Sequence, residues 1–207
     1  MLLYNHLLEW NNQYPKSELV RYQNKSYSVS DIYFEVETIS RAIYNLKGES
    51  NKPIILFLKN PVDAAISYLA CNRLNITSVI INPSWKYPEI KGAIKDIEVN
   101  FILSDWDCSK ILKDEDIGVE VCCIEEIIDS SRGCGIKSDP EVIFNSTECI
   151  LFTSGTTGNP KAVELTSDNF IESVRIWNKE IEFSENDNYV LCLSLHHISG
   201  LSILYRS

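Results

Sequence analysis

The sequence predicts an α/β fold in which a mostly parallel sheet is flanked by helices. Between residues 53 and 124, short continuous apolar runs alternate with amphipathic helical patterns, and the connections are short. Strands that are buried on both faces give such continuous runs, and strands separated by helices pair in parallel. A hydrophobic content of 44% in 207 residues is ordinary for a globular protein, and the length allows one large domain or two small ones.

The first 50 residues are expected to form two helices around a hairpin. Apolar residues at helical spacing predict a short helix within residues 2–14. Residues 19–22 and 25–29 predict the two strands of the hairpin. Ser28 and Asp31 have the spacing of a capping box, which starts the second helix. Its predicted apolar face consists of Ile32, Val36, Ile39, Ile43 and Leu46.

The sheet itself is expected from a series of β-prone runs. Asn60 and Pro61, a cap and a first-position proline, predict a helix after the first run. Residues 130–140 have no pattern and are expected to form a loop. The predicted strands are 53–58, 77–81, 99–103 and 119–124, followed by 149–152, 162–166 and 188–194. Between the last two strands, Ser167 is the expected N-cap of a helix that buries Phe170, Val174 and Trp177.

Composition excludes several classes of function. The net charge of −10 argues against nucleic-acid binding, which favours a basic surface. The apolar runs are too short to span a bilayer, and the N-terminus lacks the basic region of a signal peptide. The seven cysteines are odd in number and include no Cys-x-x-Cys, so reduced thiols and a cytoplasmic location are predicted. Cys149 and Cys192 lie in apolar runs and are expected to be buried.

The most informative stretch is Thr-Ser-Gly-Thr-Thr-Gly-Asn-Pro-Lys at residues 153–161, between two apolar runs. Its glycines allow a ligand to approach the backbone, successive N–H groups can bind an anion, and the hydroxyls and lysine add donors and charge. This chemistry suits a polyphosphate. The glycine spacing and the following strand do not match a Walker A loop. The alternative is an ordinary polar turn.

The same nine residues resemble the phosphate loop of the adenylate-forming superfamily, which includes acyl-CoA synthetases, luciferases and peptide-synthetase adenylation domains. Ala162 departs from the glycine usual after the lysine. The resemblance implies a nucleotide site, and its cofactor-binding residues are Thr153, Ser154, Gly155, Thr156, Thr157, Gly158 and Lys161.

A second motif lies at residues 193–202, Leu-Ser-Leu-His-His-Ile-Ser-Gly-Leu-Ser, at the end of the predicted strand 188–194. His197 matches a histidine beside the acyl pocket of the family, and His196 stands where Phe or Tyr is common. The form of the motif is most similar to the o-succinylbenzoate–CoA ligases of menaquinone biosynthesis. Neighbours on a strand face opposite ways, so at most one of the two faces a given pocket. A hydrogen-bonded structural histidine is the alternative, and zinc lacks further ligands nearby.

The resemblance implies a two-step ligase reaction. A carboxylate attacks the α-phosphorus of Mg-ATP, giving acyl-adenylate and pyrophosphate, and a thiol, usually of coenzyme A, then displaces AMP. Catalysis consists mainly of positioning and electrostatic stabilisation. The loop would hold the β- and γ-phosphates, Lys161 would add charge, and His197 would act as the catalytic residue of the acyl-carboxylate pocket. The partners implied are ATP, Mg²⁺, coenzyme A and a small-molecule carboxylate.

The family's adenine, ribose and magnesium motifs and its catalytic C-terminal lysine are not found in this sequence. We therefore expect an incomplete N-terminal AMP-binding domain, with an α/β subdomain at 1–140 and the phosphate-loop segment with the start of the next subdomain at 141–207. Such a piece is expected to turn over poorly alone, and to form homo-oligomers or aggregates through open sheet edges. A nucleotide-binding module, or one half of a split enzyme, is the alternative. A kinase or P-loop NTPase is disfavoured by the loop spacing.

Overall fold

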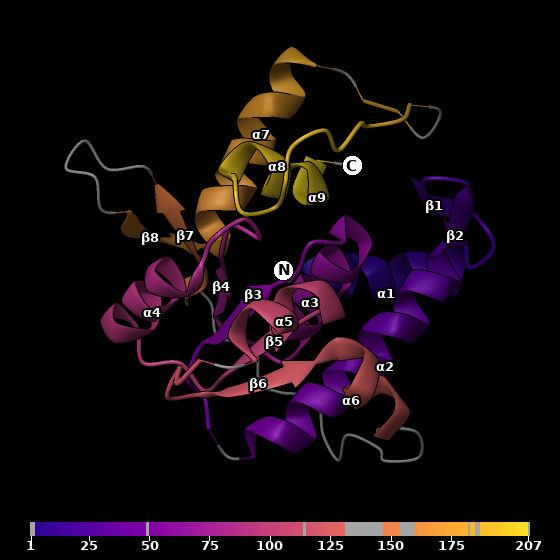
Figure 1. The fold of residues 1–207 in the computed structure, drawn as a ribbon. Coiled ribbons are helices and arrows are strands. Elements are labelled where there is room, and N and C mark those ends of the chain that lie inside the picture. The colour runs from indigo at the N-terminus through magenta and orange to yellow at the C-terminus, as the bar shows by residue number, and fades with distance from the viewer. Residues whose placement is uncertain are drawn as a thin grey trace.

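The computed structural model describes residues 3–48, 50–113, 115–130, 147–153, 160–181, 183–184 and 187–206. Within these ranges, a six-stranded sheet has the order β6-β5-β3-β4-β7-β8 (Figure 1). Its neighbouring strands are parallel, except that β8 is antiparallel to β7. The strands are β3 (Ile54–Phe57), β4 (Ser78–Ile80), β5 (Phe101–Ser104), β6 (Glu120–Cys123), β7 (Thr147–Thr153) and β8 (Lys161–Thr166). The predicted α/β class and parallel sheet are confirmed.

The N-terminal elements follow the sequence pattern closely. They are α1 (Leu3–Gln13), β1 (Glu18–Tyr22), β2 (Lys25–Ser28) and α2 (Val29–Lys47). The predicted capping box is present: the Asp31 backbone N–H donates to Ser28 Oγ at 3.1 Å, and the Ser28 N–H donates to Asp31 Oδ2 at 2.8 Å. The predicted face of α2 is buried except for Leu46, in its last turn, which is 40% exposed.

Helices cover both faces of the sheet and divide the core into two layers. The helices that come between the parallel strands in the chain are α3 (Pro61–Arg73), α4 (Tyr87–Asp96), α5 (Trp106–Leu112) and α6 (Ile124–Ser130). Ile54 and Leu56 point to the layer shared with α1, α2, α3 and α6. Ile55 and Phe57 point to the layer shared with α4 and α5. This alternation explains why β3 is a continuous apolar run, because each face has its own helices to bury it.

The C-terminal part differs from the prediction. It holds α7 (Ser167–Glu180), α8 (Ile198–Leu201) and α9 (Ile203–Arg206). The N-cap of α7 is Thr166 rather than the predicted Ser167, and of its expected core residues only Phe170 is fully buried. Residues 188–194 form no strand, so that prediction is wrong. Cys149 is buried as expected, whereas Cys192 is exposed.

A buried cluster of hydrogen-bonded polar side chains connects the C-terminal helix α9 to the sheet. The Glu148 carboxylate on β7 accepts hydrogen bonds from Asn72 Nδ2 at 2.6 Å, from the Tyr68 hydroxyl at 3.1 Å, and from the Tyr205 hydroxyl. The Tyr205 ring also stacks on Phe170, with centroids 4.2 Å apart. Burial, reinforced by the neighbouring carboxylate, raises the pKa of Tyr205 well above its ordinary value. The phenol therefore remains protonated and donates.

None of the helices within the described ranges combines the length and apolarity that a bilayer crossing requires.

Candidate functional site

The carboxyl ends of the parallel strands gather at one edge of the sheet. The chain passes from β3 to β4 on one side and then returns to β5 on the other side, so the strand order reverses between β3 and β5. Ligands of open α/β sheets bind outside the carboxyl ends of the strands, near such a reversal. The candidate site is therefore this edge.

Two of the predicted nucleotide-binding residues face each other across a strand pair at this edge. Thr153, the last residue of β7, is in register with Lys161, the first residue of β8, and Thr153 Oγ1 lies 3.4 Å from the Lys161 carbonyl oxygen. Both residues are exposed. The predicted residues Ser154, Gly155, Thr156, Thr157 and Gly158 lie outside the described part of the chain. The strand pair thus fixes where the candidate phosphate loop starts and ends.

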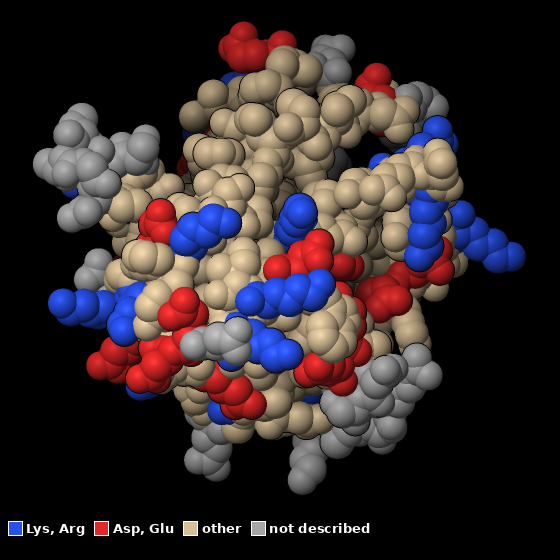
Figure 2. Space-filling model, viewed as in Figure 1, with Lys and Arg blue, Asp and Glu red and all other residues tan. Residues whose placement is uncertain are grey.

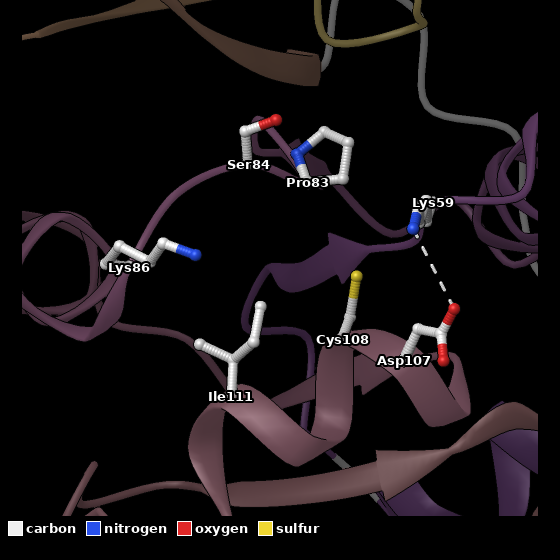
Figure 3. A pocket seen from close by; sticks show the side chains of 7 residues that line it. All are labelled: Lys59, Pro83, Ser84, Lys86, Asp107, Cys108 and Ile111. Carbon is white, nitrogen blue, oxygen red and sulfur yellow. Dashed lines mark ion pairs between the residues drawn. The ribbon is translucent and has the colours of Figure 1, made fainter.

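A pocket of about 290 Å³ opens at the same edge (Figure 3). Its lining residues follow three different strands: Lys59 follows β3, Pro83, Ser84 and Lys86 follow β4, and Asp107, Cys108 and Ile111 follow β5. Figure 3 shows the side chains of Lys86 and Cys108 pointing toward the same space. The two lysines make the pocket suitable for an anionic group.

The ring of Trp85, between two residues of the pocket wall, connects the pocket to the candidate phosphate loop. It meets the ring of Phe152 edge-on, with centroids 5.1 Å apart. Phe152 directly precedes Thr153 on β7. This aromatic pair therefore joins the pocket wall to the start of the loop. Such a pair stabilises a fold by about 0.5–1.5 kcal/mol in addition to the stabilisation from its buried area.

Sequence reasoning missed this pocket, because a lysine after a strand looks like any surface lysine. The position of Lys59 and Lys86 after successive parallel strands was the signal available. Lys59 Nζ lies 3.9 Å from Asp107 Oδ2, and both side chains are more than half exposed, so this ion pair holds the lysine only weakly. Its charge remains available to a ligand.

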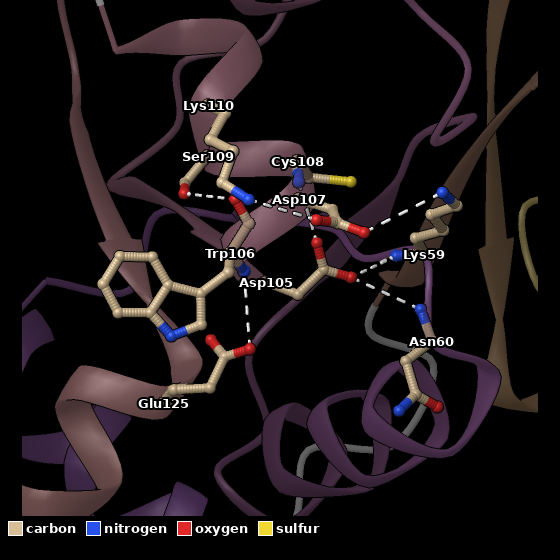
Figure 4. A network of polar contacts seen from close by, with 9 residues as sticks. All are labelled: Lys59, Asn60, Asp105, Trp106, Asp107, Cys108, Ser109, Lys110 and Glu125. Carbon is tan, nitrogen blue, oxygen red and sulfur yellow. Dashed lines mark hydrogen bonds and ion pairs between the residues drawn. The ribbon is translucent and has the colours of Figure 1, made fainter.

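Asp105 ties the end of β3 to the end of β5 (Figure 4). Its carboxylate accepts hydrogen bonds from the backbone N–H groups of Lys59 at 2.6 Å, Asn60 at 3.3 Å and Cys108 at 2.8 Å. Burial opposes the charged form, but these N–H donors outweigh it and lower the pKa of Asp105 below its ordinary value. The side chain caps α5 and fixes the backbone that positions Lys59.

Substitution of Asp105 with alanine is expected to lower the free energy of unfolding by about 2 kcal/mol, because a helix cap is lost and two further N–H groups lose their acceptor. Because its folded pKa is lowered, this contribution should be full at neutral pH and should fade as the pH drops below about 4. Urea unfolding at pH 7 and at about pH 2.5 measures both effects. Asp107→Ala, at a neighbouring exposed carboxylate, is the control and should change stability by less than about 0.5 kcal/mol. Equal effects of the two substitutions would contradict this assignment.

Asp63, in the first turn of α3, is expected to destabilise the protein at neutral pH. Burial and the nearby carboxylates of Glu125, Asp105 and Glu35 raise its pKa from 3.8 to about 6. Because its pKa is raised in the folded state, Asp63 favours folding at pH values below its unfolded-state pKa. This stabilisation is lost as the pH rises through about 6. Asp63→Asn should therefore raise stability by about 1 kcal/mol at pH 7.5, after allowance for solvent screening, and by little at pH 4. Thermal unfolding at the two pH values tests this, and a stabilisation independent of pH would refute it.

The two histidines lie in a turn before α8, not at the end of a strand. Their rings are 4.0 Å apart between centroids, which corrects the expectation that they face opposite ways. The expectation failed because a turn, unlike a strand, does not alternate its side chains. His197 is exposed; its backbone N–H donates to the Ser194 carbonyl, and its own carbonyl accepts from Gly200 and Leu201.

His196 is the more enclosed member of the pair. Its Nδ1 lies 2.8 Å from Ser194 Oγ, while its Nε2 is buried and has no hydrogen-bond partner among the described residues. Burial and the adjacent His197 lower the pKa of His196 to about 4, so it is neutral at pH 7. The contacts of His197 given above all fall within its own turn and do not reach Thr153 or Lys161. In the described ranges, no group of three His, Cys, Asp or Glu side chains is arranged to hold a metal.

Residues 7–206 match the AMP-binding enzyme family. The chain belongs to this family. Among curated members, it is 26% identical over 193 residues to the 2-succinylbenzoate–CoA ligase of Bacillus pumilus, with 93% of this chain and 39% of that protein covered. Family membership agrees with the predicted superfamily resemblance.

Solved structures of AMP-binding enzymes share the fold. The o-succinylbenzoate coenzyme A synthetase of Bacillus subtilis in complex with AMP superposes with a TM-score of 0.86 at 22% identity, covering 97% of this chain and 52% of that one. The same enzyme in complex with ATP and a magnesium ion gives 0.81 at 21% identity, covering 97% and 53%. The chain thus spans about half the length of these structures and less than half of its curated relative.

Proposed function

We propose that this chain provides the ATP-binding part of a carboxylic acid–CoA ligase that forms an acyl-adenylate and then a thioester. The observation that carries the proposal is the Thr153–Lys161 pair, which anchors a glycine- and hydroxyl-rich loop at the carboxyl edge of a parallel sheet. Family membership supports the same reaction class. The proposed acid is o-succinylbenzoate, supported by the similarity to 2-succinylbenzoate–CoA ligases.

The residues at this edge of the sheet suit a nucleoside triphosphate. Thr153 is exposed at the end of β7, and Lys161 presents an exposed ammonium group at the start of β8. We assign the β- and γ-phosphates to the loop from Thr153 to Gly158 and to Lys161. As the carboxylate attacks the α-phosphorus, charge is redistributed toward the leaving pyrophosphate. The positive charge of Lys161 at the end of the loop would stabilise that charge.

The remaining groups are assigned more broadly. His197 is proposed to contact the acyl carboxylate, and the neutral ring of His196 lies beside it. Mg²⁺ would neutralise phosphate oxygens, and we assign no protein ligand to it. We assign phosphate groups of coenzyme A to the pocket that Lys59 and Lys86 line, because their ammonium groups are positively charged.

Binding of ATP to the purified chain tests the proposal. We expect calorimetry to detect Mg-ATP binding, and Lys161→Ala to weaken it about tenfold or more, since a hydrogen bond to a charged group contributes about 1.5–3 kcal/mol. Lys52→Ala, at a half-exposed lysine ahead of β3 that pairs with Glu98, is the matched control and should leave the affinity unchanged. An affinity that does not depend on Lys161 would refute the nucleotide site.

Catalysis by the chain alone is a separate question. We expect o-succinylbenzoate-dependent exchange between ATP and pyrophosphate to be at background level, because the family's magnesium glutamate and C-terminal lysine are not among these residues. Measurable exchange would show that the 207 residues suffice. The second candidate function is a nucleotide-binding module or one half of a split enzyme, which needs only the site at Thr153 and Lys161. ATP binding without exchange agrees with both.

A further inference from the structure

Trp85 lies in the turn after β4, and hydrogen bonds fix the backbone of that turn. The Asn82 carbonyl oxygen accepts from the Trp85 N–H at 2.9 Å, and Asn82 Oδ1 accepts from the Ser84 N–H at 2.9 Å. Asn82 directly follows Ile81, whose own N–H donates to the Leu56 carbonyl oxygen on β3 at 3.3 Å. The turn is therefore attached to the sheet, and it holds the Trp85 ring in a defined position.

The Trp85 ring packs against the end of β7. Strand β4 is parallel to β7, with Ile80 opposite Leu151, so the turn after β4 lies beside the last residues of β7. The rings of Trp85 and Phe152 meet there edge-on at 63°, and both are half-buried against the core layer shared with α4 and α5. An edge-to-face pair has a preferred geometry. Trp85 therefore limits the directions that the Phe152 side chain can take.

Phe152 and Thr153 are neighbours on one strand, and their side chains point to opposite faces of the sheet. Phe152 is in register with Ala162 on β8, and Thr153 is in register with Lys161. A ring that fixes Phe152 on one face therefore also sets the direction of the Thr153 hydroxyl on the other face. Because Thr153 and Lys161 are exposed, their side chains gain little order from packing of their own.

The distribution of charge makes such positioning important for an anionic ligand. The chain has a net charge of −10. Among the described residues on the face seen in Figure 2, Lys and Arg side chains lie among Asp and Glu side chains and form no broad basic area. The overall field of the molecule therefore does not attract a polyphosphate. Binding must depend on a few donors that their neighbours hold in the correct geometry.

We propose that Trp85 is a positioning residue for nucleotide binding. Through Phe152, it holds the Thr153–Lys161 end of the β7–β8 pair in the arrangement that binds the β- and γ-phosphates of ATP. This inference rests on the nucleotide site proposed above, and it adds a residue that acts on that site through its neighbour. The residue comes from a turn that is distant in sequence from the candidate phosphate loop.

Calorimetry with Mg-ATP tests the role of Trp85. Trp85→Ala should weaken Mg-ATP binding about fivefold, the factor by which the loss of one aromatic pair changes an equilibrium. Trp85→Phe keeps a ring against Phe152 and should restore most of the affinity. Trp10→Ala, at a tryptophan on α1 that is 43% exposed, is the matched control and should leave the affinity unchanged.

A double-mutant cycle shows whether Trp85 acts through Phe152. Once Phe152→Leu has removed the partner ring, Trp85→Ala should weaken Mg-ATP binding by less than about twofold more, because substitutions of two residues in contact are not additive. Hydrogen exchange in the absence of nucleotide gives an independent measurement. Trp85→Ala should speed exchange over residues 150–153 and 161–163, and Trp10→Ala should not.

Four results would overturn the role of Trp85: equal affinities of the Trp85→Ala and Trp10→Ala chains, no restoration by Trp85→Phe, a fully additive effect with Phe152→Leu, or unchanged exchange over the two segments. If only this role is wrong, the wild-type chain still binds Mg-ATP in a way that depends on Lys161. If the nucleotide site itself is wrong, the wild-type chain does not bind Mg-ATP, or binds it independently of Lys161. The role of Trp85 in nucleotide binding is then refuted as well.

Discussion

Glu148→Ala is expected to lower the free energy of unfolding by about 3–4 kcal/mol. The carboxylate is 7% exposed and accepts from Tyr68, Asn72 and Tyr205. Its removal takes the acceptor from Asn72 Nδ2, leaves the Tyr68 and Tyr205 hydroxyls with only each other, and breaks the link between β7 and α9. The loss should be largest for the docking of residues 198–206, since the Tyr205 hydroxyl joins α9 to Glu148 on β7.

Urea unfolding followed by tryptophan fluorescence measures the loss, and hydrogen exchange locates it. Glu148→Gln keeps an acceptor oxygen at the same place and should cost less than the alanine substitution. Glu164→Ala, at an exposed glutamate on the adjoining strand β8, is the matched control and should stay within about 0.5 kcal/mol of wild type. A Glu148→Ala protein as stable as the Glu164→Ala protein would show that the cluster contributes little.

Gly200→Ala is expected to displace the turn that carries the two histidines. A Cβ atom at this position would lie 2.4 Å from the Ser194 carbonyl oxygen and 2.5 Å from that of Leu193. Because both are backbone atoms, no side-chain rotation can relieve the overlap. The cost should be about 1–3 kcal/mol, the range for overpacked sites. It should appear locally, as faster hydrogen exchange over residues 193–201.

The same substitution at Gly92 provides a control of opposite sign. Gly92 lies in α4, and a Cβ there would have no heavy atom within 4 Å. Alanine is the better helix former by about 0.5–1 kcal/mol, so Gly92→Ala should stabilise the protein. If Gly200→Ala also stabilised it, or left exchange over residues 193–201 unchanged, the tight contact between α8 and the preceding backbone would not exist in solution.

The sheet was predictable because each of its central strands is a continuous apolar run that can be recognised in the sequence. The run at 53–58 is apolar on both faces, which only a strand covered on both sides by helices requires. The same reasoning failed at residues 188–194. There the alternation of Tyr189, Leu191 and Leu193 resembles a strand, but a strand also needs a neighbour to pair with. Since no described strand lies beyond β8, these residues form neither helix nor strand, and Val190 is 71% exposed.

The candidate site was predictable only where several residues act together in sequence. The loop from Thr153 to Lys161 is continuous, so its pattern could be read directly, although its role remains a prediction. The pocket at the same edge is assembled from Lys59, Lys86 and Cys108, which follow three different strands. No local pattern connects them, because only the parallel pairing of the strands brings them together. Likewise, the enclosure of His196 depends on the fold of its turn and could not be read from the order of residues.

The single antiparallel pair in the sheet has a consequence for how the protein folds. Strands β7 and β8 pair through residues that are close in sequence, such as Thr153 and Lys161, whereas β4 and β7 pair through Ser78 and Cys149, which are far apart. Short loops close quickly, and distant pairings are slowed by the entropy of bringing the ends together. The β7–β8 hairpin should therefore form within microseconds, on the order of 1–10 μs for such a unit, and wait for the parallel strands. The Thr153–Lys161 pair would then be the first part of the site to form, before the parallel strands close the sheet.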